Sequence, residues 1–189
     1  TGKTWSAPWC CAICALPGKE PWPESKGVKA SMTFLISFNL NGKEISVQAR
    51  PRQTLLQLLR EDLQVLSLKN SCNVGECGAC TVLLDGRAVR SCLLLAAMVS
   101  GKRVETVEAL GVPGRLHPLQ QAFLTSGAVQ CGYCTSGMLL TAKALLDQNP
   151  HPTREEIRAA MSGNLCLCTG YKKILDAVEL AAKMMGGEA

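Results

Sequence analysis

The sequence predicts an α+β fold in which a small mixed β-sheet precedes a group of helices. The first half contains two hairpin signals with one helical segment between them, whereas every later segment has a helical period. A connection rich in Gly and Pro at 111–114 separates the two patterns. A chain of 189 residues can form two small domains, which we expect at 32–110 and 115–189.

The first half alternates apolar and polar residues around two turn signals. Asn41-Gly42 and Asp85-Gly86 favour tight hairpins, and Thr54 is a typical helix cap. The expected elements are strands at 33–40 and 43–49, a helix from 54 to 59, strands at 81–84 and 88–90, a short helix at 93–99, and a strand at 103–107. Two hairpins and a helix crossing a sheet describe a β-grasp.

The second half predicts four helices. Thr153 and Glu156 form a capping box before the third helix, and Asn149-Pro150 ends the second. The expected helices span 117–124, 137–147, 154–161 and 171–185.

Residues 1–31 have no helical or strand period, and they contain three Trp and four Pro. We interpret them as a poorly structured extension. Their cysteines, Cys10, Cys11 and Cys14, have no nearby fourth ligand and stay unassigned.

Composition excludes several classes of function. The net charge is +5, but the basic residues are dispersed, which disfavours a nucleic-acid partner. The sequence contains no run of about 18 apolar residues, so it predicts no membrane span. Residues 1–30 lack the pattern of a signal peptide. The chain has 11 cysteines, clustered with short spacers, which points to metal binding rather than disulfides. A reducing compartment is implied, and we expect the cytoplasm.

The first cysteine group is Cys72, Cys77, Cys80 and Cys92, with four, two and eleven residues between successive members. This order is the plant-type 2Fe–2S ligand pattern. Gly75 and Gly78 allow left-handed turns that aim backbone N–H groups at thiolates. Structural zinc prefers two paired C-x2-C knuckles, so the spacing favours iron and sulfur.

The second group consists of two pairs, Cys131 with Cys134 and Cys166 with Cys168, separated by 31 residues. Each pair precedes an expected helix, whose N-terminus favours an anionic group. Spacing alone leaves zinc as an open alternative to a 2Fe–2S cluster.

Three segments carry a family resemblance: Ser71 to Val82 (SCNVGECGACTV), Gln130 to Thr135 (QCGYCT) and Gly163 to Tyr171 (GNLCLCTGY). Together they resemble the iron–sulfur small subunit of the xanthine dehydrogenase family of molybdenum hydroxylases. The likeness runs from about residue 33 to 182, and all eight cysteines of the two groups fall where the family has its cluster ligands.

The resemblance implies an electron relay with no catalytic residue of its own. A molybdenum–pterin cofactor would be held by a large partner subunit and FAD by a medium subunit. Gln130 and Cys168 would approach the pterin. The substrate of such a complex would be an N-heterocycle of the purine or nicotinate kind, an aldehyde, or carbon monoxide. A free-standing two-cluster ferredoxin and a zinc-binding interaction module are the alternative readings.

Two residues depart from the family pattern. Leu167 stands where the family usually has Arg, and Ser136 stands where Pro is common. A cation near a cluster favours its reduced state, so Leu167 predicts a lower reduction potential.

Overall fold

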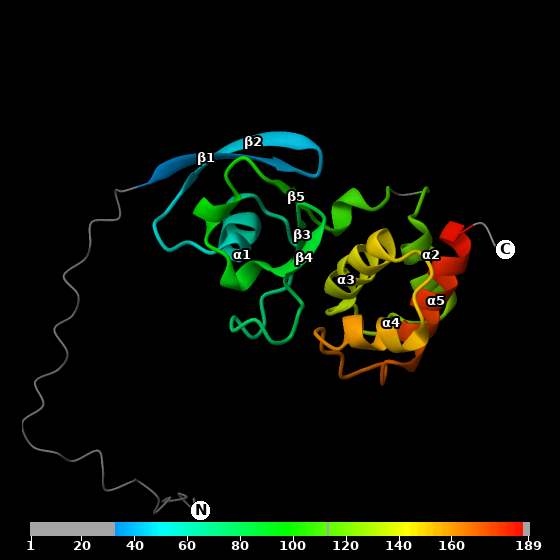
Figure 1. Ribbon diagram of the computed structural model, residues 1–189. Coiled ribbons are helices and arrows are strands. Elements are labelled where there is room, and N and C mark those ends of the chain that lie inside the picture. The colour runs from blue at the N-terminus through cyan, green and yellow to red at the C-terminus, as the bar shows by residue number, and fades with distance from the viewer. Residues whose placement is uncertain (1–32, 113, 187–189) are drawn as a thin grey trace, which may run out of the picture. The chain divides into compact units, whose positions relative to one another are not determined.

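The computed structural model describes residues 33–112 and 114–186 (Figure 1). The expected extension at 1–31, with its three cysteines, lies outside the described residues. The described residues all belong to one compact unit. A domain boundary near residues 110–115 stays a prediction.

The first half forms a five-stranded mixed sheet with strand order β2-β1-β5-β3-β4. Strands β1 and β5 run parallel, and the other neighbours are antiparallel. The strands are β1 (Phe34–Leu40), β2 (Lys43–Ala49), β3 (Thr81–Leu84), β4 (Arg87–Arg90) and β5 (Arg103–Glu105). Both predicted hairpins are confirmed, and Asn41 and Asp85 take the positive φ that such turns require.

The helix that crosses the sheet begins at the predicted cap. Thr54 and Gln57 form a capping box at the start of α1 (Leu55–Gln57). The chain then continues as a π-helical turn, Leu58–Asp62, which the leucine period did not distinguish from an α-helix. Four leucines of this segment are at most 2% exposed, so they anchor it to the sheet: Leu55, Leu56, Leu58 and Leu59.

The short helix expected near 93–99 is confirmed only in part. Two 3-10 turns, Ser91–Leu93 and Ala96–Val99, lie in this region. Between them the backbone pairs with the start of the crossing helix: the N–H of Leu55 donates to the carbonyl of Leu94, and the N–H of Ala96 donates to that of Gln53. These long-range bonds hold residues 94 and 95 extended and interrupt the helix.

The second half contains the four expected helices (Figure 1). They are α2 (Pro118–Thr125), α3 (Thr135–Gln148), α4 (Arg154–Met161) and α5 (Lys172–Gly186). The capping box of Thr153 and Glu156 is confirmed at α4. Helix α3 begins two residues earlier than expected, directly after Cys134. None of the helices in the described part of the chain is long and apolar enough to cross a membrane.

Two hydrophobic cores stabilise the structure. One lies between the sheet and the crossing helix and includes Cys80 and Cys92, and the other lies among α2 to α5. Leu83 of β3 belongs to the helical core although it comes from the sheet. The strand that follows Cys80 therefore packs directly against the helices, which brings the two cysteine groups to one seam.

Candidate metal centres

The first cysteine group lies mainly on the loop between the π-helical turn and β3. Cys72, Cys77 and Cys80 lie on this loop, and Cys92 lies in the 3-10 turn after β4. The hairpin of β3 and β4 folds back and brings Cys92 to Cys80, whose thiols contact each other. The thiols of Cys72 and Cys77 form a second contact. All four predicted members of the group are thus brought together as two pairs.

Backbone N–H groups of the loop point at Cys72. The N–H of Cys77 donates to the Cys72 sulfur at 3.4 Å. Together with the N–H groups of Val74 and Glu76, it lowers the pKa of the Cys72 thiol to about 6. The loop therefore favours thiolate at this position, as expected for the ligand of a metal.

Glycine is required at Gly78 for two reasons. Its φ is +70°, and a Cβ there would lie 2.7 Å from both the side chain of Asn164 and the carbonyl of Gly163. The close approach allows the loop after α4 to contact the first cysteine loop. Gly75 also has a left-handed backbone, with φ at +83°.

Cys80 and Cys92 lie deeper than Cys72. Both are buried, at 3% and 7% exposure. Burial, and then the neighbouring Cys80 thiol, raises the pKa of Cys92 to about 11. This pair therefore needs a compensating positive charge, such as iron, before both thiols can be ionised.

The second group also consists of two contacting pairs. The Cys131 and Cys168 sulfurs lie 3.6 Å apart and are exposed, whereas Cys134 and Cys166 are half-buried and touch. Burial, and then the Cys166 thiol, raises the pKa of Cys134 to about 12. Burial opposes ionisation of Cys166 as well, but the hydroxyl and N–H of Thr169 lower its pKa overall.

Each pair precedes a helix, as expected, but neither helix begins at the residue that the sequence predicted. Cys134 directly precedes α3, which begins at Thr135 rather than at the expected residue 137. Cys168 is separated from the first residue of α5, Lys172, by three residues. Thr169 and the N–H of Cys168, rather than the helix end, supply the hydrogen bonds to Cys166. The reason is that the chain turns at Gly170 and Tyr171, both with positive φ, before the helix starts.

Direct hydrogen bonds join the two cysteine loops. The most central runs from the N–H of Leu165 to the carbonyl of Cys77, at 2.9 Å. Three side chains of the helical half donate to carbonyls of the first loop: Asn164 to Gly78, Tyr133 to Asn70 and Ser136 to Ser67. These four contacts place a ligand-bearing loop of each group against the other.

Sequence reasoning missed Asn164, which is 1% exposed. Its amide donates to the carbonyl of Gly78, and its carbonyl accepts from the hydroxyl of Thr141 on α3. Tyr171 donates to the Asn164 backbone carbonyl and accepts from the N–H of Cys166. The only sequence signal for Asn164 was its position between Gly163 and Cys166, inside the third motif.

A hollow of about 330 Å³ lies where the two groups meet. Five of the eight cysteines in the two groups line this hollow, and its other lining residues are mainly apolar. Leu167 beside it is fully exposed, and Gln130 is exposed next to Cys131. The surface around the second group is therefore open and apolar.

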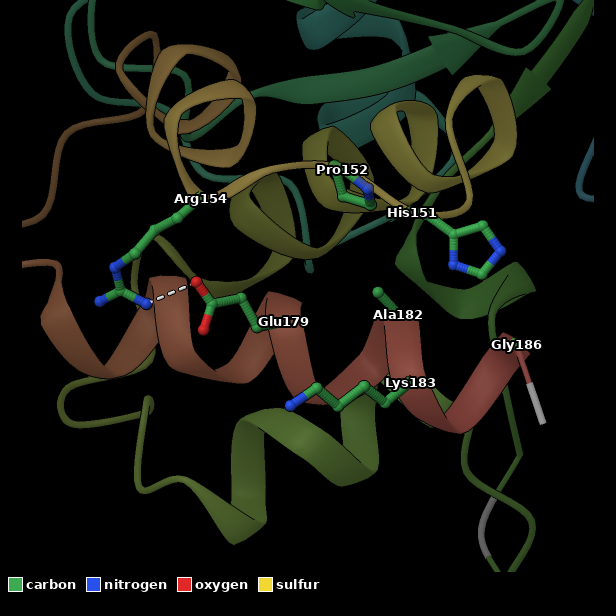
Figure 2. Close-up of a pocket in the computed structure, with 7 residues that line it drawn as sticks. All are labelled: His151, Pro152, Arg154, Glu179, Ala182, Lys183 and Gly186. Atoms are coloured by element: carbon green, nitrogen blue, oxygen red, sulfur yellow. Dashed lines mark hydrogen bonds and ion pairs between the residues drawn. The ribbon is translucent and has the colours of Figure 1, made fainter. Parts of the chain in front are cut away.

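A second pocket, of about 310 Å³, lies between the start of α4 and the end of α5 (Figure 2). An ion pair between Arg154 and Glu179 crosses it, and none of the cysteines that the structure describes lines it. It has no connection with the thiol chemistry described above.

The donor set fits 2Fe–2S clusters. Within residues 33–112 and 114–186, no group of three or more His, Cys, Asp or Glu side chains is placed to hold a metal ion. The thiols instead lie as contacting pairs, two in each group. A 2Fe–2S cluster has four thiolate ligands, two on each iron, which this arrangement provides.

Comparison with known proteins decides between iron and zinc. Residues 38–110 match the 2Fe-2S iron-sulfur cluster binding domain, and residues 106–179 match the 2Fe-2S binding domain. The nicotinate dehydrogenase small FeS subunit of Eubacterium barkeri is 54% identical over 78% of this chain and 94% of its own length. The xanthine dehydrogenase iron-sulfur-binding subunit of Escherichia coli O157:H7 is 47% identical over 78% of this chain and 94% of its own length.

The chain belongs to the iron–sulfur subunits of the molybdenum hydroxylase family. The structure of quinoline 2-oxidoreductase from Pseudomonas putida 86 agrees, with a TM-score of 0.78 and 44% identity over 84% of this chain and 100% of the matched chain. The predicted α+β fold, the two 2Fe–2S-binding domains and membership of an oxidoreductase complex are thereby confirmed, and the zinc alternative is excluded.

Proposed function

We propose that this chain passes electrons between two partner subunits, from a molybdenum–pterin site through two 2Fe–2S clusters to FAD. One observation carries the proposal: eight thiols form two four-thiol groups, and the N–H of Leu165 joins the second group to the carbonyl of Cys77. When bound, such clusters accept and release single electrons. The chain itself supplies ligands, burial and hydrogen bonds.

The contacting pairs suggest which thiolates share an iron. In the first group, Cys72 and Cys77 would hold one iron, and Cys80 and Cys92 the other. In the second group, the pairs would be Cys131 with Cys168 and Cys134 with Cys166. The support is that each pair already touches in the folded chain.

The molybdenum subunit would cover the surface around the second group. Leu165 and Leu167, at 53% and 101% exposure, offer the apolar area that a permanent partner buries. Gln130 and Cys168 are both exposed on this side, where a pterin held by the partner could approach them. A free-standing ferredoxin would need polar residues here, because it meets its partners only transiently.

The FAD subunit would lie against the first group. Val74 on the loop and Leu93 after Cys92 are both more than 60% exposed, which gives a second apolar patch beside the ligands. Electrons would then enter at one group and leave at the other.

We place the complex in the cytoplasm, where thiols stay reduced until clusters are assembled. Its substrate would be an N-heterocycle of the nicotinate or purine kind, in line with the names of the similar proteins. The residues that select this substrate would lie on the molybdenum subunit.

Purification of the native complex tests the proposal. Two larger subunits should co-purify, the complex should contain four irons per copy of this chain, and substrate should reduce both clusters in rapid-freeze EPR. Co-purified subunits with only one cluster would contradict the relay. A chain that is isolated alone with both clusters would instead support the free-standing ferredoxin.

A further inference from the structure

Arg90 occupies the seam between the two cysteine groups. It is the last residue of β4, two positions before Cys92. Its guanidinium donates to the hydroxyl of Thr81, at 3.0 Å, and to the carbonyl of Gly163 in the helical half. Thr81 directly follows Cys80, and Gly163 lies three residues before Cys166. The Arg90 side chain therefore joins a residue close in sequence to a ligand of the first group to one close to a ligand of the second.

Gly163 leaves room for this bridge. A Cβ at Gly163 would lie 2.5 Å from Nη2 of Arg90, so any side chain there would displace the guanidinium. Thr81 is fully buried, and its hydroxyl, which accepts from Arg90, also donates to the carbonyl of Gly78 at 2.7 Å. The hydrogen bonds to Thr81 and Gly163 thus hold the position of the guanidinium.

The charge of Arg90 has no acidic partner in the described part of the chain. None of the ion pairs found there includes it. Its Nε is buried and has no hydrogen-bond partner among the described residues. An arginine keeps its charge in proteins, and an uncompensated, partly buried charge is costly. A nearby anion would remove this cost.

We propose that the charge of Arg90 is balanced by the cluster at Cys72, Cys77, Cys80 and Cys92, and that Arg90 raises the reduction potential of this cluster. The inference rests on the proposed binding of clusters by these thiols. A cluster becomes more negative by one charge when it accepts an electron, so a fixed cation favours the reduced form. Burial of Cys80 and Cys92 weakens solvent screening on this side. Arg90 would therefore shift the electron-transfer equilibrium toward reduction of the first cluster.

The test compares Arg90→Met, which removes the charge, with Arg90→Lys, which keeps it, in the full-length chain with both clusters. Reduction potentials are measured by EPR-monitored titration, and the two signals are assigned with Cys131→Ser. Arg90→Met should shift the reduction equilibrium of the first cluster about tenfold toward the oxidised form, which is about 59 mV for one electron. Arg90→Lys should shift it less than threefold, and the second cluster should move less in both.

Unchanged potentials in Arg90→Met would overturn the inference. An equal fall in Arg90→Lys would also overturn it, because geometry rather than charge would then be responsible. If Arg90→Met does not fold, Arg90→Gln provides a neutral polar replacement for the same comparison. A wild-type chain that binds no cluster would instead contradict the proposed function, so the two failures are distinguishable.

Discussion

The backbone N–H of Leu165 donates to the carbonyl of Cys77 across 88 residues of sequence, at 2.9 Å. Cys77 belongs to the first cysteine group, and Leu165 directly precedes Cys166 of the second. The bond belongs to the backbone, so its strength does not depend on the side chain at 165. This allows the bond to be removed separately from that side chain.

Leu165→Pro should destabilise the chain, because proline has no N–H and leaves the carbonyl of Cys77 without this donor. We expect a loss of about 1–3 kcal/mol in the free energy of unfolding, measured in urea by circular dichroism. Leu165→Ala is the matched control, since it keeps the N–H and removes a side chain that is 53% exposed. Equal losses in both variants would show that the backbone bond is unimportant.

Ser136 stands where the family resemblance predicts a proline, and its hydroxyl donates to the carbonyl of Ser67 at 2.8 Å. Ser136→Ala should cost about 0.5–1.5 kcal/mol in unfolding free energy, the usual net value of a hydrogen bond. Thr135→Ala, one residue earlier in the same helical turn, should cost less. Ser136→Pro should fold, because the first turn of a helix tolerates proline. A Ser136→Ala variant as stable as wild type would contradict the role assigned to the hydroxyl.

Leu167 is fully exposed between Cys166 and Cys168. Leu167→Arg should raise the reduction potential of the second cluster, because the added cation favours the reduced state. Screening by solvent limits the shift to about 30 mV, roughly a threefold change in the one-electron equilibrium. Redox titration at low and high salt should show the shift shrinking as salt rises. If Leu167→Arg leaves both potentials unchanged, the effect assigned to the missing arginine is wrong.

His117 makes stability depend on pH. Its Nδ1 accepts from the N–H of Leu119 at the start of α2, and burial, followed by the charge of Lys143, lowers its pKa below the ordinary 6.5, while Asp147 opposes the shift. The unfolded chain therefore binds more protons, and stability falls as pH decreases from about 6.5 through the lowered pKa.

His117→Asn provides the control for this dependence, because asparagine caps helices without titrating. Urea unfolding at pH 7.5 and 5.5 should show the wild type losing about 1 kcal/mol more than His117→Asn, the typical contribution of a cap. The same pH dependence in both proteins would assign it to other groups.

Several features followed from local sequence. The turns at Asn41 and Asp85 were predictable because few residues tolerate a positive φ, and the cap at Thr153 because its box needs only residues three positions apart. The cysteines from Cys72 to Cys92 were also predictable as one group, because a single loop and a single hairpin contain all four of them. In contrast, the helix expected near 93–99 is shortened to a 3-10 turn at Ala96–Val99, because long-range backbone bonds to residues 53 and 55 hold residues 94 and 95 extended.

The sequence by itself determined the α+β fold, the two sets of four cysteines and the family, since periodicity, turn chemistry and motif spacing are local properties. Only the tertiary structure decided how the thiols pair, which of them are buried, and that the two loops meet. It also revealed Arg90 and Asn164, whose partners lie 73 and 86 residues away. Such contacts leave no periodic signal, because they arise only when the strand after Cys80 packs against the helices.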